Sequence, residues 1–565
     1  MRVGIYAGNN LSLSLYKKCF AITWLVGCFL LIFPSRIFII KYVEVLFLHR
    51  MLEMPWLWHG LLISCGLGGV LIFILLQFLT ILFKDRISSK ANKLALLVFG
   101  VIQILIVCLI LYKANWVFGD DHMFISTTAI GKYFGLDSLS GGRFYPLGHF
   151  HFNLLVWIAN ILKIKNAISV VPHFILIVFF YLLTASGLYL LFREICGDRL
   201  NLIAVFFAAV FPLLVSAFQV VFMELIYPES IVIPLLIFLL YLLYKGQITD
   251  KTKYYIGAGI VAVYVLYCKE PISGSFLVVA LTNLIFCFKE QTTKERVFHF
   301  LLLINTVLYL GLYYFLVFRD TTSFYNVGRV NFDTAFFLPF FNPIYIMGFI
   351  LALARVFYVL VRNDKAHLYY DSFLFAGVAY LFAYILLRLN GDYYLLPAVI
   401  LFLPSLVYWT KYLYVKKRNI ALLWLILLIL ICGLNYRWVV KGVINILQER
   451  RTFVPYVRGL CGLHEKREFI WYESDKTLDD NKFSQVVRDY QKYVFNVFLN
   501  YVMVDKAMDD FFLVTRDISF LSRNDIVFFY SNQNNQGSPM PINYLAEQGF
   551  ELYADLYGVQ IYAQE

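Results

Sequence analysis

The sequence predicts a mainly α-helical protein that spans a membrane many times. Hydrophobic residues make up 61% of the 565 residues and charged residues only 15%, whereas a soluble domain carries about 25% charged residues. Apolar runs follow one another along most of the chain, many of them near the roughly 20 residues that a bilayer requires. Lys and Arg lie mainly in short loops between these runs, so the net charge of +12 follows from membrane topology and indicates no nucleic-acid partner.

Hydropathy along the chain predicts about thirteen transmembrane helices. The candidate spans are residues 19–40, 59–83, 94–112, 168–192, 201–220, 230–244, 254–268, 273–288, 297–318, 338–361, 368–387, 394–410 and 419–436. Pro212 interrupts the span at 201–220, and Pro271 interrupts the stretch 254–288. Because proline removes a hydrogen-bond donor from a helix, these two stretches could be broken or re-entrant.

The distribution of Lys and Arg over the loops predicts the orientation. Alternate loops are basic and contain Lys17, Lys18, Lys84, Arg86, Lys90, Lys93, Lys245, Lys251, Lys253, Lys289, Lys294, Arg296, Lys411, Lys416, Lys417 and Arg418. Since basic loops stay in the cytoplasm, we expect these loops and the N-terminus to be cytoplasmic. The loops 113–167, 221–229, 319–337 and 388–393, and everything after 437, would then face outward. No eukaryotic retention signal is recognisable, so we expect the bacterial inner membrane.

Composition divides the chain into an N-terminal, a central and a C-terminal part. Residues 1–93 hold transmembrane helices whose role the sequence leaves open, and residues 94–436 hold the remaining spans. Residues 437–565 are polar and of mixed charge. We expect this last part to be a small exported α/β domain, and we see no catalytic constellation in it.

Local patterns support the α/β prediction for the C-terminal part. Residues 469–474 and 525–532 are typical of strands, and 480–504 has the apolar spacing of an amphipathic helix. The final stretch, NYLAEQGFELYADLYGVQIYAQ, predicts a short helix that stops at Gly549, followed by two strands with a turn near Tyr557-Gly558.

The first large external loop carries the most unusual polar residues. Residues 115–158 are too apolar for a solvated linker and too polar to span, so we expect short helices at the membrane interface. Asp120 and Asp121 stand at the start of this loop, directly after a span. Adjacent carboxylates repel each other, which in a partly desolvated site raises the pKa of one of them and suits a general base.

Other ionisable residues are predicted to reach the same outer face. They are Glu224, Glu229, Lys269, Glu270, Arg319, Asp320, Arg329, Arg388 and Asp392. Ionisable residues at membrane depth indicate a functional site. A carboxylate can deprotonate a hydroxyl or stabilise positive charge at a sugar carbon, and basic side chains can hold a phosphate. Transfer of a sugar from a polyprenyl phosphate to a hydroxyl uses both kinds of group.

At these residues the sequence resembles the GT-C superfamily of polytopic membrane glycosyltransferases. The features that carry the resemblance are the Asp120-Asp121 pair after an early span, Gly135, the Pro146-Leu147 pair, Glu229 in YPES, the NGDYYLLPAVI loop at 390–400 and an exported C-terminal domain. They are sparse motifs over most of 94–410. The spans at 19–40 and 59–83 and the use of Asp-Asp instead of Asp-Glu depart from the usual family pattern.

The resemblance implies the roles of the site residues. It implies a polyprenyl-phosphate-linked sugar donor, a hexosyl or pentosyl transfer at the outer face, Asp120 as the general base and Asp121 as its helper. Donor-phosphate binding would fall to Arg388, Lys269, Arg143 and Tyr393, and the acceptor side to Glu229 and His149. The acceptor could be a cell-surface glycan, a glycolipid or a protein. No cofactor is certain, and a divalent metal, Mg²⁺ or Mn²⁺, stays open.

Each candidate also has a purely structural interpretation. The acidic pair could be loop carboxylates in water, and His149 and His151, two residues apart, would lie on different faces of a helix and pack at the interface. Glu229 could stabilise a helix N-terminus, Arg388 could anchor a span by snorkelling, and Lys269-Glu270 could form an ion pair.

Other functions were weighed against the glycosyltransferase. A lipid or polysaccharide flippase needs polar residues inside spans and an internal repeat, and we see few of the former and no convincing repeat. A lipid-linked glycan polymerase or ligase would have its large external loop late in the chain, whereas here the interfacial loop is early.

Overall fold

The structure is a computed structural model. It describes residues 90–117, 121, 124, 145, 147–161, 170–197, 201–215, 217–315, 337–362, 368–387, 389 and 391–416, and from there on residues 420, 424, 427–428, 431, 435, 439–440, 442–451, 453, 457, 469–472, 492, 494–495, 512–515, 525–530, 545–556 and 559–563. The predicted spans at 19–40 and 59–83 lie outside the described residues.

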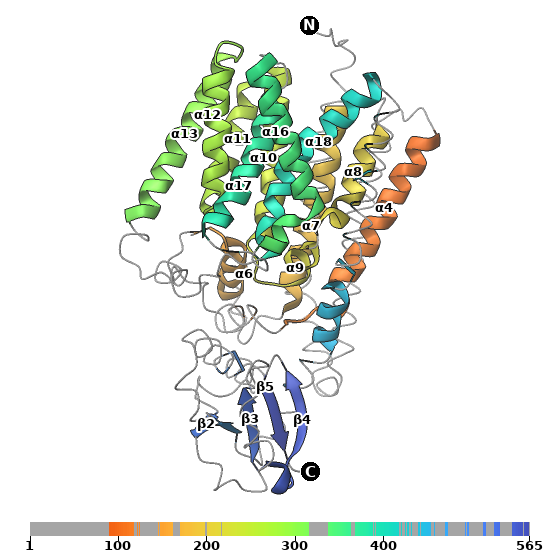
Figure 1. The fold of residues 1–565 in the computed structure, drawn as a ribbon, viewed down its shortest axis with the longest axis vertical. Helices are drawn as coiled ribbons and strands as arrows, with labels where there is room; N and C mark the ends of the chain where they lie inside the picture. Colours follow the sequence, from red (N-terminus) through yellow and green to blue (C-terminus); the bar gives the residue numbers. More distant parts are fainter. Residues whose placement is uncertain are drawn as a thin grey trace.

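Most described residues belong to a bundle of apolar helices (Figure 1). Its helices are α4 (Lys90–Leu111), α6 (Phe150–Ile161), α7 (Val170–Cys196), α8 (Asn201–Leu214), α9 (Phe218–Met223), α10 (Glu229–Thr249), α11 (Thr252–Cys268), α12 (Ile272–Phe286), α13 (Thr293–Tyr313), α16 (Pro343–Arg362), α17 (Leu368–Leu387) and α18 (Leu396–Lys416), with short 3₁₀ helices η6 (Leu338–Phe341) and η7 (Asp392–Leu395).

Within the described residues, five helices are long and apolar enough to cross a membrane, and four shorter apolar helices accompany them. Large apolar side chains on α11 and α13 point outward, among them Ile260 at 67% exposure and Leu308 at 59%. Lipid contact makes such surfaces favourable, whereas a soluble monomer rarely shows large ones. The chain is therefore a mainly helical integral membrane protein, and a total of about thirteen spans stays a prediction.

The predicted breaks lie close to the observed ones. Helix α8 continues through Pro212 to Leu214, and α9 begins only at Phe218, so the stretch 201–220 is broken just after the proline. Pro271 is the N-cap residue of α12, since it cannot donate to the preceding helix. The stretch 254–288 is thus two helices joined at Lys269-Glu270-Pro271.

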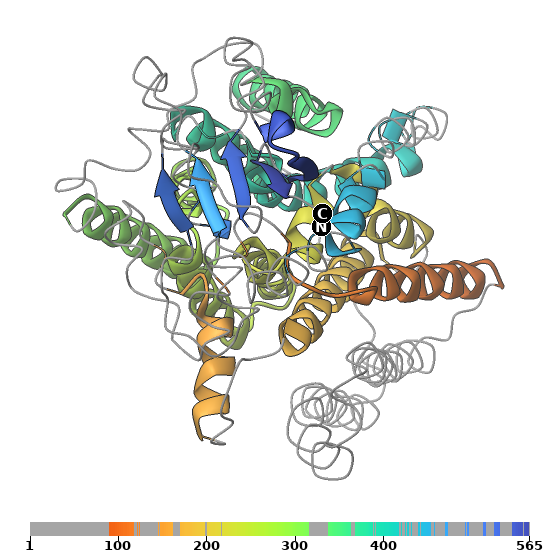
Figure 2. The same cartoon turned by 90° about the horizontal axis from the view of Figure 1, so that it is seen from below.

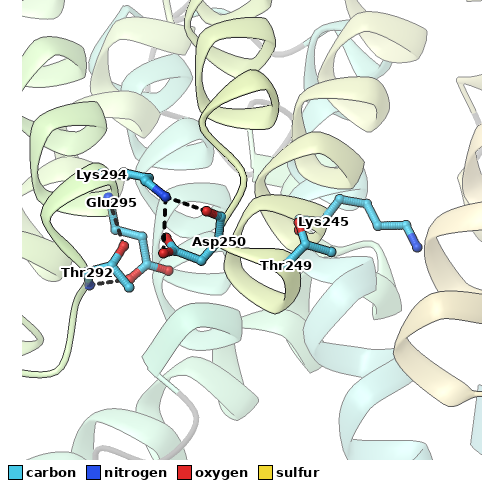
Figure 3. A network of polar contacts seen from close by, with 6 residues as sticks. All are labelled: Lys245, Thr249, Asp250, Thr292, Lys294 and Glu295. Atoms are coloured by element: carbon cyan, nitrogen blue, oxygen red, sulfur yellow. Dashed lines mark hydrogen bonds and ion pairs between the residues drawn. The ribbon is translucent and has the colours of Figure 1, made fainter. Parts of the chain in front are cut away.

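The two ends of the bundle differ in chemistry. Figure 3 shows the turns after α10 and before α13, where Lys294 Nζ lies 3.2 Å from Asp250 Oδ2 and Thr292 forms a reciprocal capping box with Glu295. Six described basic residues of the predicted cytoplasmic loops lie in or beside these turns: Lys245, Lys251, Lys253, Lys289, Lys294 and Arg296. Helices α6 and α9 lie at the opposite end (Figure 1).

Beyond α6 and α9 lies a five-stranded sheet, which Figure 2 shows in front of the bundle. Its strands are β1 (Phe469–Tyr472), β2 (Phe512–Thr515), β3 (Ile526–Tyr530), β4 (Glu551–Leu556) and β5 (Val559–Ala563), in the order β2-β1-β3-β5-β4. Strands β2, β1 and β3 are parallel, and β5 and β4 are antiparallel to their neighbours.

The sheet contains all four strands predicted from the sequence and one more. Strands β1 and β3 fall inside 469–474 and 525–532, and β4 and β5 follow Gly549, which has the positive φ of 82° that ends a helix. Strand β2 was not predicted. Of the predicted helix at 480–504, the described residues Lys492, Val494 and Phe495 are helical. An exported α/β domain as a unit stays a prediction.

Candidate functional site

Several turns meet at the end of the bundle that bears α6 and α9. The turn before α6 is joined to the end of α11, because Leu147 N donates to Tyr267 O (3.1 Å) and Cys268 Sγ donates to Leu147 O (3.4 Å). His149 Nε2 lies 2.9 Å from the carbonyl oxygen of Ile226, just before α10. Because a carbonyl oxygen only accepts, this nitrogen carries the proton. Residues distant in sequence are thus fixed side by side.

Asp121, the second residue of the acidic pair, connects two of these segments. Its carboxylate is buried at 1% exposure, with Oδ2 accepting from Val117 N (2.9 Å) and Oδ1 accepting from Leu225 N (3.1 Å). One bond is local and the other crosses to the residues after α9. Asp121 therefore braces the acidic segment against the approach to α10. Asp120 lies outside the described residues.

Glu229 and Lys269 form a buried ion pair at the same end of the bundle. Lys269 Nζ lies 2.6 Å from Glu229 Oε1, with side-chain exposures of 2% and 0%. Glu229 is in the first turn of α10, where the helix dipole favours an acid, and Lys269 directly follows α11. The sequence suggested a pair with Glu270 instead. Two buried charges carry a desolvation cost, so we treat this pair as a candidate functional site.

Tyrosine rings surround this ion pair. Lys269 Nζ lies 4.8 Å from the centre of the Tyr394 ring, a cation–π distance. Tyr394 stacks on Tyr384 at 5.1 Å and contacts Tyr393 at 4.0 Å, and Tyr393 contacts Tyr227 at 4.3 Å. A Cβ at Gly391 would lie 2.9 Å from the Tyr393 ring, so glycine is required for this packing.

Two buried tyrosines of α17 near this pair were not found from the sequence. Tyr380 and Tyr384 lie on α17, where they are buried with ring centres 5.2 Å apart. Inside an apolar span they look like lipid-facing residues. Their spacing of four, which places both on one helix face, was the available signal.

His151 lies on α6 and packs among aromatic rings. It is buried with its ring 4.2 Å from Phe152 and 5.4 Å from Phe180. Burial, together with His149 and His173 nearby, lowers the pKa of His151 well below its ordinary value, so the ring is neutral. Among the described residues, no group of three His, Cys, Asp or Glu side chains is placed to hold a metal ion.

Two of the predicted phosphate-binding residues, Arg143 and Arg388, lie outside the described residues. Of the other ionisable residues predicted for the outer face, Arg319, Asp320 and Arg329 also lie outside them, and the side chain of Asp392 is not described. Lys269 and Tyr393, both described, are close to each other through Tyr394. The roles of the two arginines stay predictions.

Arg450 is a site residue that sequence reasoning missed. It is buried at 3% exposure, and its guanidinium donates to the carbonyl oxygens of Ile110 (3.0 Å), Tyr112 (3.2 Å) and Met223. In the sequence it belongs to the run Gln-Glu-Arg-Arg after the last predicted span, which is typical of a solvated surface.

Comparison with known proteins adds a family match for part of the chain. Residues 153–315 match the family model for dolichyl-phosphate-mannose-protein mannosyltransferases. The resemblance to the GT-C superfamily is confirmed over this segment. The segment runs from α6 to the end of α13 and contains Glu229 and Lys269, whereas the acidic pair precedes it.

Among solved structures, the chain is similar to ArnT from Cupriavidus metallidurans. The structure of ArnT bound to undecaprenyl phosphate has 11% sequence identity and a TM-score of 0.42, covering 84% of this chain and 98% of that one. The apo structure of ArnT gives 12% identity and the same TM-score of 0.42. Values this low do not by themselves establish a common fold. Comparison with curated protein sequences found no significant match.

Proposed function

We propose that this protein is a membrane glycosyltransferase. It transfers a hexosyl or pentosyl group from a polyprenyl-phosphate-linked donor to a hydroxyl of a cell-surface glycan, a glycolipid or a protein. The observation that carries the proposal is the buried Lys269–Glu229 pair in its tyrosine shell, at the end of the bundle where Asp121 anchors the acidic segment. The family match over 153–315 supports the same reaction class.

The donor phosphate binds at Lys269 in this proposal. Phosphate oxygens would replace the Glu229 carboxylate as partner of the Lys269 ammonium, with Tyr393 and Tyr394 closing the site around them. Arg143 and Arg388 would add charge at the phosphate, as the resemblance implies. A preorganised cation in a water-poor site stabilises the negative charge that develops on the leaving phosphate.

Asp120 acts as the general base. The acceptor hydroxyl oxygen attacks the anomeric carbon, the bond from that carbon to the phosphate oxygen breaks, and polyprenyl phosphate leaves with the electron pair. The hydroxyl proton passes to Asp120. Asp121 cannot easily take that role, because both its oxygens already accept backbone N–H groups, and it positions Asp120 instead.

Orientation follows from the two ends of the bundle. The basic turns shown in Figure 3 would face the cytoplasm, so the site and the sheet would lie at the outer face of a bacterial inner membrane. There the protein would meet lipid-linked donors and envelope acceptors. A dependence on Mg²⁺ or Mn²⁺ stays a prediction from the sequence.

The test is release of polyprenyl phosphate from a panel of synthetic polyprenyl-phosphate sugars, with an acceptor extract. We expect Asp120→Asn to bind undecaprenyl phosphate as the wild type does and to lose turnover by about 10²–10⁴-fold, the usual contribution of a general base. Glu290→Gln, which changes an exposed carboxylate at the basic end, is the control and should keep full activity.

The outcomes separate the reaction from the residue assignment. If the wild type releases polyprenyl phosphate from no donor, the glycosyltransferase proposal is wrong. If the wild type is active and Asp120→Asn retains its rate, the reaction stands and the base is another residue.

A further inference from the structure

Arg450 holds two chain segments that precede different parts of the site. Its guanidinium bonds to carbonyls at the end of α4, Ile110 and Tyr112, and to Met223 at the end of α9. The guanidinium carbon lies 4.6 Å from the Phe174 ring centre on α7. A planar fork with several donors suits such multiple contacts, which a lysine cannot reproduce.

Asp121 bonds to the same two segments. It accepts from Val117 N, a few residues after α4, and from Leu225 N, two residues after Met223. Burial lowers the pKa of Arg450 to about 10, whereas the nearby carboxylates of Asp121 and Glu224 act in the opposite direction and favour its charged form. Arg450 is therefore a cation near neutral pH, and the two residues form one brace.

The same brace reaches the C-terminal sheet through aromatic side chains. Phe453, three residues after Arg450, packs edge-on against Trp116 with ring centres 5.6 Å apart. Phe453 also contacts Phe495 at 6.1 Å, and Phe495 contacts Phe528 of β3 at 6.0 Å. Figure 1 shows the sheet beyond the end of the bundle that bears α6 and α9. A continuous packed path thus runs from the sheet to the residues just before Asp121.

We infer that Arg450 is a positioning residue for the acidic pair, and that the C-terminal region takes part in the reaction by carrying it. This inference rests on the proposed function for its catalytic consequence. With the brace in place, the segments after α4 and α9 hold Asp121, and with it the acidic segment, in a fixed position relative to the Lys269 site. A misplacement of about 1 Å costs on the order of 10²-fold in rate.

The test compares Arg450→Lys with Arg451→Lys, the same substitution at the next residue, which is exposed. For Arg450→Lys we expect turnover to fall about 10- to 100-fold, with the KM for the polyprenyl-phosphate sugar unchanged, because Lys269 is not disturbed. Amide hydrogen exchange should become faster in peptides covering 110–117 and 223–229. Arg451→Lys should change neither quantity.

A double variant adds a measure of coupling. If Arg450 acts through Asp121, then Asp121→Asn combined with Arg450→Lys should be no slower than the slower single variant. Additive losses would overturn the inference. So would unchanged exchange in Arg450→Lys, or a rise in donor KM with kcat unchanged.

Folding and function are kept apart by two further measurements. If Arg450→Lys does not fold, Phe453→Leu is the alternative variant, because it retains the guanidinium and loosens only its aromatic support. Phe453→Leu should lower kcat by a smaller factor and leave the donor KM unchanged. An unchanged kcat would overturn the inference. If the wild type turns over no donor, the proposed function fails, and the exchange data alone decide whether the brace exists.

Discussion

Single side chains at the site show how burial assigns different tasks to similar groups. Asp121 is fixed by two backbone N–H donors, which suits a brace, and in the proposed mechanism Asp120 is the base. Glu229, another buried acid, faces a cation instead. A buried ion pair adds little stability when intact, but removing one partner leaves an uncompensated charge. The pair is therefore suited to exchange partners with a ligand.

We predict that Glu229→Gln destabilises the protein without ligand by about 3–5 kcal/mol, because Lys269 loses its counter-charge. Undecaprenyl phosphate should then raise the melting temperature of Glu229→Gln more than that of the wild type, since the phosphate supplies the missing negative charge. Thermal unfolding in detergent, with and without the lipid, measures both effects.

The control is Glu229→Gln combined with Lys269→Met, which removes both charges. It should recover stability and lose the larger response to the lipid. An equal lipid-induced shift in the wild type and Glu229→Gln would show that the phosphate does not bind at Lys269.

At the scale of helices, small residues and one buried ion pair decide the packing of α16, α17 and α18. Phe402 of α18 lies between Gly348 and Gly377, where added Cβ atoms would come within 2.5 Å of its ring. In the same group of helices, Arg355 of α16 forms a buried bidentate pair with Asp371 of α17, and the Trp409 ring of α18 lies over the Arg355 guanidinium, 4.7 Å from its carbon. Small residues allow this close approach of helices in a membrane.

We predict that Gly377→Ala destabilises the bundle by about 1–3 kcal/mol, because the new methyl group meets both Phe402 and the backbone oxygen of Ala398. Gly311→Ala on α13 has nothing within 4 Å of the added atom, and should be neutral or gain up to about 1 kcal/mol. Thermal unfolding compares the two. Phe402→Leu should partly restore Gly377→Ala, and its failure to do so would contradict the packing argument.

The helices themselves were largely predictable. The span 368–387 coincides with α17, because a run of apolar residues bounded by polar ones has few other solutions in a membrane. The break after α8 was misplaced to Pro212, since a helix whose freed carbonyls find other partners tolerates proline. Arg450, Tyr380 and Tyr384 were missed because their significance depends on contacts between distant segments, which hydropathy and local spacing do not report.

The whole molecule has one end that carries the candidate site and one basic end. Asp121, His149, Glu229 and Lys269 are all buried at the end near α6, as the loop assignments predicted for the outer face. Sequence could predict this grouping because alternate loops must lie on opposite sides of a membrane. It could not predict which acid pairs with which base, and Lys269 pairs with Glu229 rather than its neighbour.

We predict that the basic end is cytoplasmic. In a variant whose native cysteines are replaced, a cysteine at exposed Lys253 should resist a membrane-impermeant maleimide in cells with a permeabilised outer membrane, and one at exposed Glu547 should react. Both should react once the inner membrane is opened. Labelling of Lys253→Cys in intact inner membranes would invert the proposed orientation.

The Lys269–Glu229 pair also has a consequence for biosynthesis. Glu229 begins α10 and Lys269 follows α11, and these two helices are consecutive and packed side by side. Closing this hairpin brings the two charges together. If the ribosome-bound chain delivers α10 and α11 to the bilayer as one unit, neither charge has to meet lipid alone, which would cost several kcal/mol. The pair to which we assign the donor phosphate would thus first serve as the internal counter-ion that lets its own hairpin enter the membrane.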